Sequence, residues 1–294
     1  MIRIENLSKF YGKKAAIKDV CLEISDGEIY GFIGPNGAGK STTIKAMLNY
    51  IFADAGTVTI DGLDSVVENK TIKSLVGYVP SEVNFYPELT GYEVIALSMK
   101  FHGCTDDAYA HSLCREFQID ETKKMRDLSL GNKKKVAIVS ALVLNPKILI
   151  MDEPTNGLDP LIQNILFTHL RKQSEAGVTV FISSHNLREI QEHCDRVAFI
   201  KDGAILKVIN LDDYNLTGKF VSASGDVLEL KKMATKILRD EDHKVSFIYE
   251  GDLNALLVAL SKTALTDVTI EEVSIEHQFI EYYKEEADHA IITD

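Results

Sequence analysis

Three glycines, a lysine and several hydroxyls lie close together in GPNGAGKSTT, residues 34–43, directly after the apolar run at residues 29–33. Glycines let a loop turn its backbone N–H groups inward, and the helical pattern after the loop directs a positive helix end to the same point. Lys40 adds a charge suited to β- and γ-phosphates, and the Ser41 hydroxyl is a suitable ligand for Mg²⁺. We therefore predict a nucleoside triphosphate site. The residues expected to contact the nucleotide here are Gly34, Pro35, Asn36, Gly37, Ala38, Gly39, Lys40, Ser41 and Thr42.

The alternative interpretation of this stretch is a glycine-rich turn with a solvated lysine. It is weaker, because the residues fit the pattern G-x-x-x-x-G-K-[ST] with a strand-like run before it and a helical run after it.

Two adjacent acids, Asp152 and Glu153, follow the apolar run at residues 148–151. Short apolar runs of this kind are typical of strands buried in a parallel sheet, and α/β sheets hold their ligands at the carboxyl ends of such strands. Asp152 is therefore expected to bind Mg²⁺, and Glu153 to accept a proton from the attacking water. Adjacent acids in an acidic chain are usually solvated, and it is their position after the strand that favours the catalytic interpretation.

A third strand-like run, residues 178–183, is followed by Ser184 and His185. A histidine at such a place is more often the beginning of a helix than a catalytic group. Because the carboxyl ends of the neighbouring strands are expected at the same edge of the sheet, we predict that His185 contacts the γ-phosphate.

The composition describes an ordinary globular chain of 294 residues, 45% apolar and 26% charged, long enough for one large domain or two smaller ones. The longest apolar run, residues 136–144, is far shorter than the roughly 20 residues of a membrane-spanning helix. The N-terminal residues lack a hydrophobic signal core, and the four cysteines have no metal or disulfide spacing. A cytoplasmic location is therefore expected.

Charge is unevenly distributed along the chain. Residues 210–294 contain 8 Lys and Arg against 18 Asp and Glu, whereas residues 1–209 contain 24 against 26. The acidic tail would repel a phosphate backbone, so no nucleic-acid partner is expected. Strand-like and helical patterns alternate in the tail, with a last helix after Ser274, which predicts a small α+β module at 210–294 beside a larger domain at 1–209.

Residues 1–209 resemble the ATP-binding subunit of an ABC transporter, because the motifs above occur in that family's order. The resemblance implies an α/β P-loop NTPase fold with a mixed, largely parallel sheet and a helical subdomain at about residues 84–145. It also implies that Tyr11 stacks on the adenine of ATP, that Asp159 of the D-loop NGLD lies near the nucleotide, and that His185 is the switch histidine.

The stretch LSLGN, residues 128–132, stands where the family has LSGGQ, with Ser129 and Gly131 retained. In the family this signature motif contacts the γ-phosphate held by the opposite subunit. The resemblance therefore implies a head-to-tail dimer, of two copies or of this chain with a related one, with two ATP molecules between the subunits. Ser129 is also a suitable N-cap for the next helix. Two of the three lysines at residues 133–135 are expected to be solvated.

A second departure from the family follows Pro80, where the usual glutamine is replaced by Ser81 and then Glu82. The family's glutamine contacts the metal and the attacking water, and its loop couples to the membrane subunit. Ser81 is assigned the metal contact here, but its side chain is shorter. The substitution is expected to affect coupling and the rate of hydrolysis more than ATP binding.

The resemblance implies an ATPase that drives transport through a separate membrane permease, from the inner face of the cell membrane. Leu130 in the signature and the ending EEVSIEHQFIEYY resemble bacitracin- and lantibiotic-type exporters, which implies export. Two alternatives are open. A hydrolysis-impaired regulatory subunit paired with a related ATPase would fit the substitutions at Ser81 and Leu130. A soluble ABC ATPase outside transport usually carries paired cassettes or long insertions, and this sequence shows neither.

Overall fold

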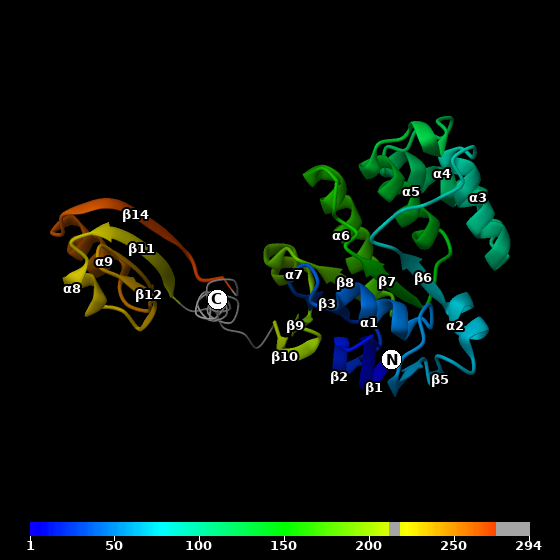
Figure 1. Cartoon of the computed structure of the whole chain (residues 1–294). Coiled ribbons are helices and arrows are strands. Elements are labelled where there is room, and N and C mark those ends of the chain that lie inside the picture. Colours follow the sequence, from blue (N-terminus) through cyan, green and yellow to red (C-terminus); the bar gives the residue numbers. More distant parts are fainter. Residues whose placement is uncertain (212–217, 275–294) are drawn as a thin grey trace. The chain divides into compact units, whose positions relative to one another are not determined.

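The computed structural model describes residues 1–211 and 218–274, and the chain divides into two compact units, Met1–Asp212 and Asp213–Asp294 (Figure 1). All four cysteines are free thiols. Among the described residues, no helix has the length and apolar character needed to cross a membrane. That residues 1–209 and 210–294 fold as separate domains stays a prediction.

The first unit is built on a six-stranded sheet with the strand order β10-β9-β3-β8-β7-β6. Strands β9, β3, β8, β7 and β6 run parallel to one another, and β10 pairs antiparallel with β9, so the predicted mixed α/β sheet is confirmed. Every residue of β3, β7 and β8 is buried, which explains why apolar runs rather than an alternating pattern mark them in the sequence. The bounds are β3 Ile29–Ile33, β6 Val76–Val79, β7 Ile148–Asp152, β8 Thr179–Ser184, β9 Arg196–Lys201 and β10 Ala204–Asn210.

The carboxyl ends of three of these strands lie at one edge of the sheet. Ile33 at the end of β3 pairs with Ser184, and Asp152 at the end of β7 pairs with Ser183. The glycine-rich loop, the two acids and His185 therefore leave the sheet side by side, although they are far apart in the chain. The elements that follow β3, β7 and β8 are the helices α1 Lys40–Met47, α6 Pro160–Glu175 and α7 Leu187–His193.

A second, antiparallel sheet covers α1 and has the strand order β2-β1-β4-β5. Its apolar side chains share one buried core with α1 and the central sheet; Ile4, Ile44 and Phe32 come from these three layers. The helix after the glycine-rich loop is thus fixed between two sheets. The remaining bounds here are β1 Ile2–Tyr11, β2 Lys14–Ile24, β4 Ala55–Ile60, β5 Leu63–Asp64 and α2 Asn69–Leu75.

Between β6 and β7 the chain is helical, with α3 Gly91–His102, α4 Asp107–Glu116, the 3₁₀ turn η1 Met125–Asp127 and α5 Leu130–Leu142. A capping box begins α3, as the spacing of Thr90 and Glu93 in the sequence allows: Thr90 Oγ1 accepts a hydrogen bond from the Glu93 amide at 3.1 Å, and Glu93 Oε2 accepts one from the Thr90 amide at 2.7 Å. The helices begin at Gly91, whereas the helical pattern in the sequence already began near residue 84.

The second unit contains a four-stranded antiparallel sheet with the order β12-β13-β11-β14 and two helices that pack against it. Val221, Phe247 and Leu256 form part of its core, in agreement with the expected α+β pattern. Its last predicted helix, after Ser274, lies outside the described residues. The bounds are β11 Lys219–Gly225, α8 Leu228–Lys231, β12 Lys236–Glu241, β13 Lys244–Tyr249, α9 Leu253–Ser261 and β14 Leu265–Glu272.

Candidate nucleotide-binding site

The loop between β3 and α1 adopts a conformation that requires glycine. Gly37 and Gly39 have φ angles of 83° and 109°. A Cβ atom on Gly39 would lie 2.7 Å from Ile17 Cγ2 and 2.8 Å from the Ala16 carbonyl oxygen, so the bare backbone packs against β2. Gly39 is also the N-cap of α1 and offers no side chain to the first-turn amides. A helix end of this kind attracts an anion.

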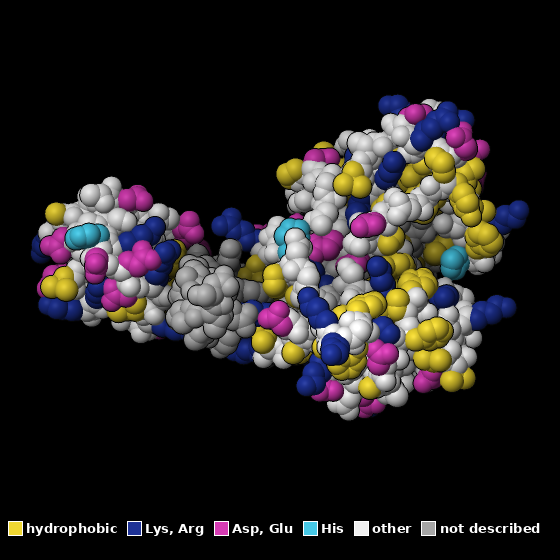
Figure 2. All heavy atoms as spheres, viewed as in Figure 1, with side chains coloured by type: hydrophobic (Ala, Val, Ile, Leu, Met, Phe, Trp, Pro, Cys, Tyr) yellow, Lys and Arg dark blue, Asp and Glu magenta, His cyan; other side chains and the backbone are white. Residues whose placement is uncertain are grey.

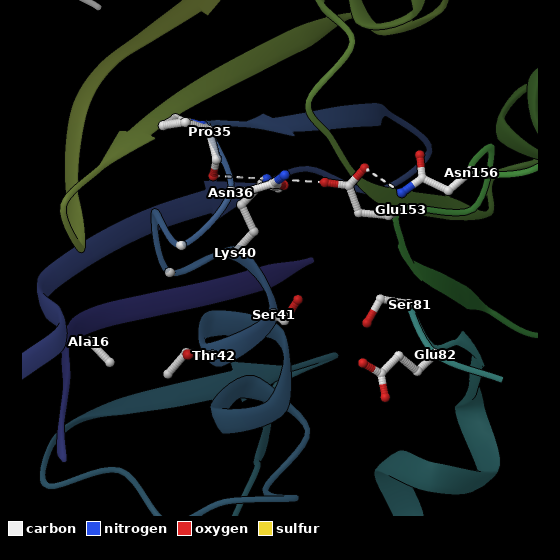
Figure 3. A pocket seen from close by; sticks show the side chains of 12 residues that line it. Ala16, Pro35, Asn36, Lys40, Ser41, Thr42, Ser81, Glu82, Glu153 and Asn156 are labelled. Carbon is white, nitrogen blue, oxygen red and sulfur yellow. Dashed lines mark hydrogen bonds and ion pairs between the residues drawn. The ribbon is translucent and has the colours of Figure 1, made fainter. Parts of the chain in front are cut away.

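Lys40 begins α1 and is only 6% exposed. Its Nζ donates hydrogen bonds to the carbonyl oxygens of Gly34 at 2.6 Å and Pro35 at 3.2 Å. It also forms an ion pair with Glu153, with 3.0 Å between Nζ and Oε1 (Figure 3). The lysine thus joins the glycine-rich loop to the end of β7 at the place where phosphates are expected.

Glu153 has a φ of 49°, a left-handed conformation that is uncommon outside glycine and that clusters at functional sites. Its Oε2 lies 2.7 Å from His185 Nδ1 and accepts a hydrogen bond from Asn156 Nδ2 at 3.3 Å. Burial raises the pKa of Glu153, but the hydrogen bonds and the positive charges of His185 and Lys40 together outweigh burial and hold the pKa below its ordinary value. Glu153 is therefore an ionised carboxylate and a weak base while these partners hold it.

Asp152 is fully buried, and its two carboxylate oxygens differ. Oδ1 accepts a hydrogen bond from Ser183 Oγ at 2.7 Å, whereas Oδ2 has no hydrogen-bond partner within the described part of the chain. A buried carboxylate oxygen is costly to leave unpaired, so this atom fits a cation. Magnesium prefers one or two carboxylates together with hydroxyl, water and phosphate oxygens. Asp152, with Ser41, therefore suits the predicted Mg²⁺.

A cavity of about 390 Å³ lies beside Lys40 and Glu153, and neither Asp152 nor His185 lines it. Figure 3 shows Ser81 and Glu82 across this space from Ser41. The structure therefore brings Ser81 to the predicted site and adds three residues that sequence reasoning missed: Ala16, Glu82 and Asn156. Glu82 and Asn156 stood beside predicted residues, which was the available signal. The full lining comprises Ala16, Pro35, Asn36, Gly37, Gly39, Lys40, Ser41, Thr42, Ser81, Glu82, Glu153 and Asn156.

Tyr11 does not line this cavity; it is 57% exposed at the end of β1, with Lys9 Nζ 5.7 Å from its ring centre. An exposed aromatic face leaves room for a base to stack, and its adenine contact stays a prediction. Gly34 and Ala38 do not line the cavity either, although Gly34 receives the Lys40 hydrogen bond.

Ser129, Gly131 and Asp159 lie away from the cavity lining, at the beginnings of α5 and α6. Ser129 Oγ accepts a hydrogen bond from the Asn132 amide at 3.3 Å, and Asp159 Oδ1 accepts one from the Ile162 amide at 3.1 Å. A Cβ atom on Gly131 would lie 2.3 Å from the Gly157 carbonyl oxygen, so this glycine allows the signature and the D-loop to pack together. The signature and the D-loop thus form one surface that is separate from the cavity lining.

The expectation that two of the lysines at residues 133–135 are solvated is wrong. Lys134 is 1% exposed and Lys135 is 8% exposed. Burial lowers the pKa of Lys134, and the negative charges of Asp152 and Glu153 oppose that shift. The helix turns these positions toward the core, and a run of like charges in the sequence does not reveal this.

A phosphate-binding loop, a buried acid pair and a histidine at one edge of a mixed sheet define a P-loop nucleoside triphosphatase. The chain belongs to the ABC transporter family, as relatives 33% and 34% identical to it show, and the family's model, described as ABC transporter, matches residues 17–156. The protein is an ATP-binding subunit of an ABC transporter and an ATPase.

Among similar proteins, the bacitracin transport ATP-binding protein BcrA of Enterococcus faecalis is 34% identical over 250 residues, covering 84% of this chain and 80% of BcrA. The Nod factor export ATP-binding protein I of Burkholderia lata is 33% identical over 246 residues, covering 82% and 79%. The dimeric post-hydrolysis state of the ATP-binding cassette MJ0796, bound to ADP and Pi, superposes with a TM-score of 0.67 at 28% identity, covering 72% of this chain and 99% of that one.

Proposed function

We propose that this subunit binds Mg-ATP in the cavity beside Lys40 and uses its hydrolysis to drive export through a separate membrane permease. The carrying observation is the chain of contacts from the buried Lys40 through the buried Glu153 to the half-exposed His185, next to Asp152 Oδ2, which has no partner among the described residues. The direction of transport is supported by the relative named for Nod factor export.

Binding of ATP changes the partners of Lys40. Phosphate oxygens compete with the Glu153 carboxylate for the lysine ammonium, because both are anions that seek the same buried cation. When Lys40 turns to the phosphates, Glu153 loses one of the two contacts that lower its pKa. It then becomes a stronger base and can accept a proton from water. The resting ion pair thus delays base activation until nucleotide is bound.

His185 stays hydrogen-bonded to Glu153 and is half-exposed, so it can orient the carboxylate on one side and meet a γ-phosphate on the other. Bound Mg²⁺, held by Ser41 and Asp152 with Ser81 within reach, would neutralise phosphate charge during transfer. Ser41 and Asp152 are suited to that role by a free hydroxyl at the cavity and a buried unpaired oxygen.

A head-to-tail dimer would complete the site. Ser129, Gly131 and Asp159 do not line the cavity of their own chain, and Leu130 between them is 63% exposed. Such a surface fits a role in the partner's ATP site. The dimeric arrangement of the similar cassette MJ0796 supports this proposal.

A groove of about 480 Å³ supports the proposed permease contact, and with it a position at the inner face of the membrane. It lies between the central sheet and α3, and its lining includes Tyr50, Phe85, Phe101 and Leu144. Phe101 is 79% exposed, and Figure 2 shows hydrophobic side chains gathered over the part of the unit that contains α3. An apolar groove with exposed aromatic residues is suited to an inserted helix of a membrane partner.

The test is phosphate release by the purified chain, alone and with the permease that co-purifies with it. Mg-dependent release that Lys40→Met abolishes is expected. Tight ATP binding without release, alone and in the complex, would instead favour the regulatory alternative that Ser81 and Leu130 keep open. If the chain is an active ATPase and no membrane protein co-purifies with it, a role outside transport would be favoured.

A further inference from the structure

Among the described residues of the first unit, Lys134 is the most deeply buried charged side chain that has no role in the site described above. It lies in α5, begins no helix, lines no part of the nucleotide cavity and is 1% exposed. Lysine is almost never fully buried unless its ammonium group is compensated. The partners of Nζ therefore decide what this residue does.

Those partners are two backbone carbonyls of one loop. Nζ donates hydrogen bonds to the carbonyl oxygens of Pro80, at 2.9 Å, and Ser81, at 2.8 Å. Both residues follow β6, which ends at Val79. Asp152 and Glu153 act on Lys134 through their charges, but no ion pair within residues 1–211 and 218–274 involves it, so its hydrogen bonds go to this loop.

The same loop supplies one wall of the nucleotide cavity. The side chains of Ser81 and Glu82 line it, and Figure 3 shows them opposite Ser41. In the described part of the chain, the backbone of residues 80–83 forms no other hydrogen bond than those from Lys134. Lys134 therefore supplies the hydrogen bonds that hold this wall, beside the packing of the buried Val83.

We propose that Lys134 is a positioning residue for ATP hydrolysis: its ammonium group ties the signature helix α5 to the loop after β6 and so sets where Ser81 and Glu82 lie at the cavity. Ser129 caps the beginning of the same helix. A displacement of α5 at the partner's ATP is thereby passed to the loop at its own chain's ATP. The effect on turnover rests on the proposed function, whereas the tie itself does not.

The experiment compares the full chain with Lys134→Met, which keeps the apolar stem and removes the ammonium group, and with Lys133→Met as the matched control on the same helix. NMR backbone order parameters of residues 81–86 and 130–142 are measured without nucleotide, and ATP affinity and kcat are measured separately. The order parameters of residues 81–86 are expected to fall from about 0.85 to below about 0.6 in Lys134→Met, because the two carbonyl contacts that hold the loop are lost. The kcat is expected to fall about ten- to a hundredfold, because the cavity wall is misplaced.

ATP affinity and the order parameters of α5 are expected to stay near the wild-type values in Lys134→Met, and Lys133→Met should match the wild type throughout. Unchanged order parameters of the loop in Lys134→Met overturn the proposal, as does a loss of ATP affinity as large as that of Lys40→Met. If Lys134→Met does not fold, Lys134→Gln decides: its neutral amide forms weaker hydrogen bonds, so the order parameters of the loop must still fall. A wild-type chain that does not bind ATP would contradict the proposed function, but the comparison of the loop at residues 81–86 between wild type and Lys134→Met would still hold.

Discussion

The first unit contains two helix beginnings of the kind that attract phosphate, and they are built differently. At α1 the cap is Gly39, which has no side chain, and beside it lie the buried Lys40 and a cavity. At α5 the cap is Ser129, whose hydroxyl already accepts a hydrogen bond from the helix, and the next residue, Leu130, is largely exposed.

This difference indicates what binds at each helix beginning, a nucleotide or a second subunit. In the described part of the chain no side chain caps the beginning of α1, and Lys40 and Glu153 lie beside it, which agrees with the proposed binding of ATP there. The beginning of α5 is capped by Ser129 and followed by the exposed Leu130, which agrees with the proposed role at the ATP of a second subunit. Variants that act on one helix beginning and spare the other test this division.

Glu153→Gln should give the largest effect, at the α1 site. Removing the base is expected to lower kcat by about 10²- to 10⁴-fold. ATP affinity should rise, because Lys40 loses its charged competitor. Phosphate release and nucleotide titration measure the two changes, with the exposed Glu175→Gln as control. Undiminished turnover would remove the base assignment.

Ser129→Arg should affect the α5 site alone. ATP binding to the isolated chain is expected to persist, while turnover falls about a hundredfold because the γ-phosphate loses its contact from the partner. Mixing this variant with Lys40→Met, itself inactive, should restore activity, since one of the two sites in a mixed dimer is then intact. No recovery on mixing would contradict the shared site.

Tyr11→Ala is expected to weaken ATP binding by about 1–3 kcal/mol through loss of stacking on adenine, with little change in kcat. Phe10→Ala is the matched control, because Phe10 is the preceding residue of β1 and is also exposed. Fluorescence of an adenine-labelled nucleotide follows the affinity. Equal losses in both variants would point to a general change in β1 instead of stacking.

Ser81→Gln should give the smallest effect, a rise in kcat of about a few-fold, because a longer amide reaches further into the cavity toward metal and water. Backbone contacts with Lys134 are unaffected by this change of side chain. Steady-state turnover at saturating Mg-ATP is the measurement. A fall in kcat would show that the chain is adapted to the shorter serine.

The sequence determined the parts of this protein that depend on a few neighbouring residues. The glycine-rich loop, the acids after the β7 strand, the capping box of Thr90 and Glu93 and the cap Ser129 are all local patterns of backbone conformation and hydrogen bonding, and each was readable before the structure. The parallel sheet was also readable, because strands buried on both faces are apolar throughout.

Only the tertiary structure decided which distant groups meet. The ion pair of Lys40 with Glu153, the unpaired Oδ2 of Asp152 and the burial of Lys134 under the Pro80–Ser81 loop join segments that the chain keeps far apart. The physical reason is that the free energy of a buried charge depends on the groups packed around it, and the whole fold brings those groups together.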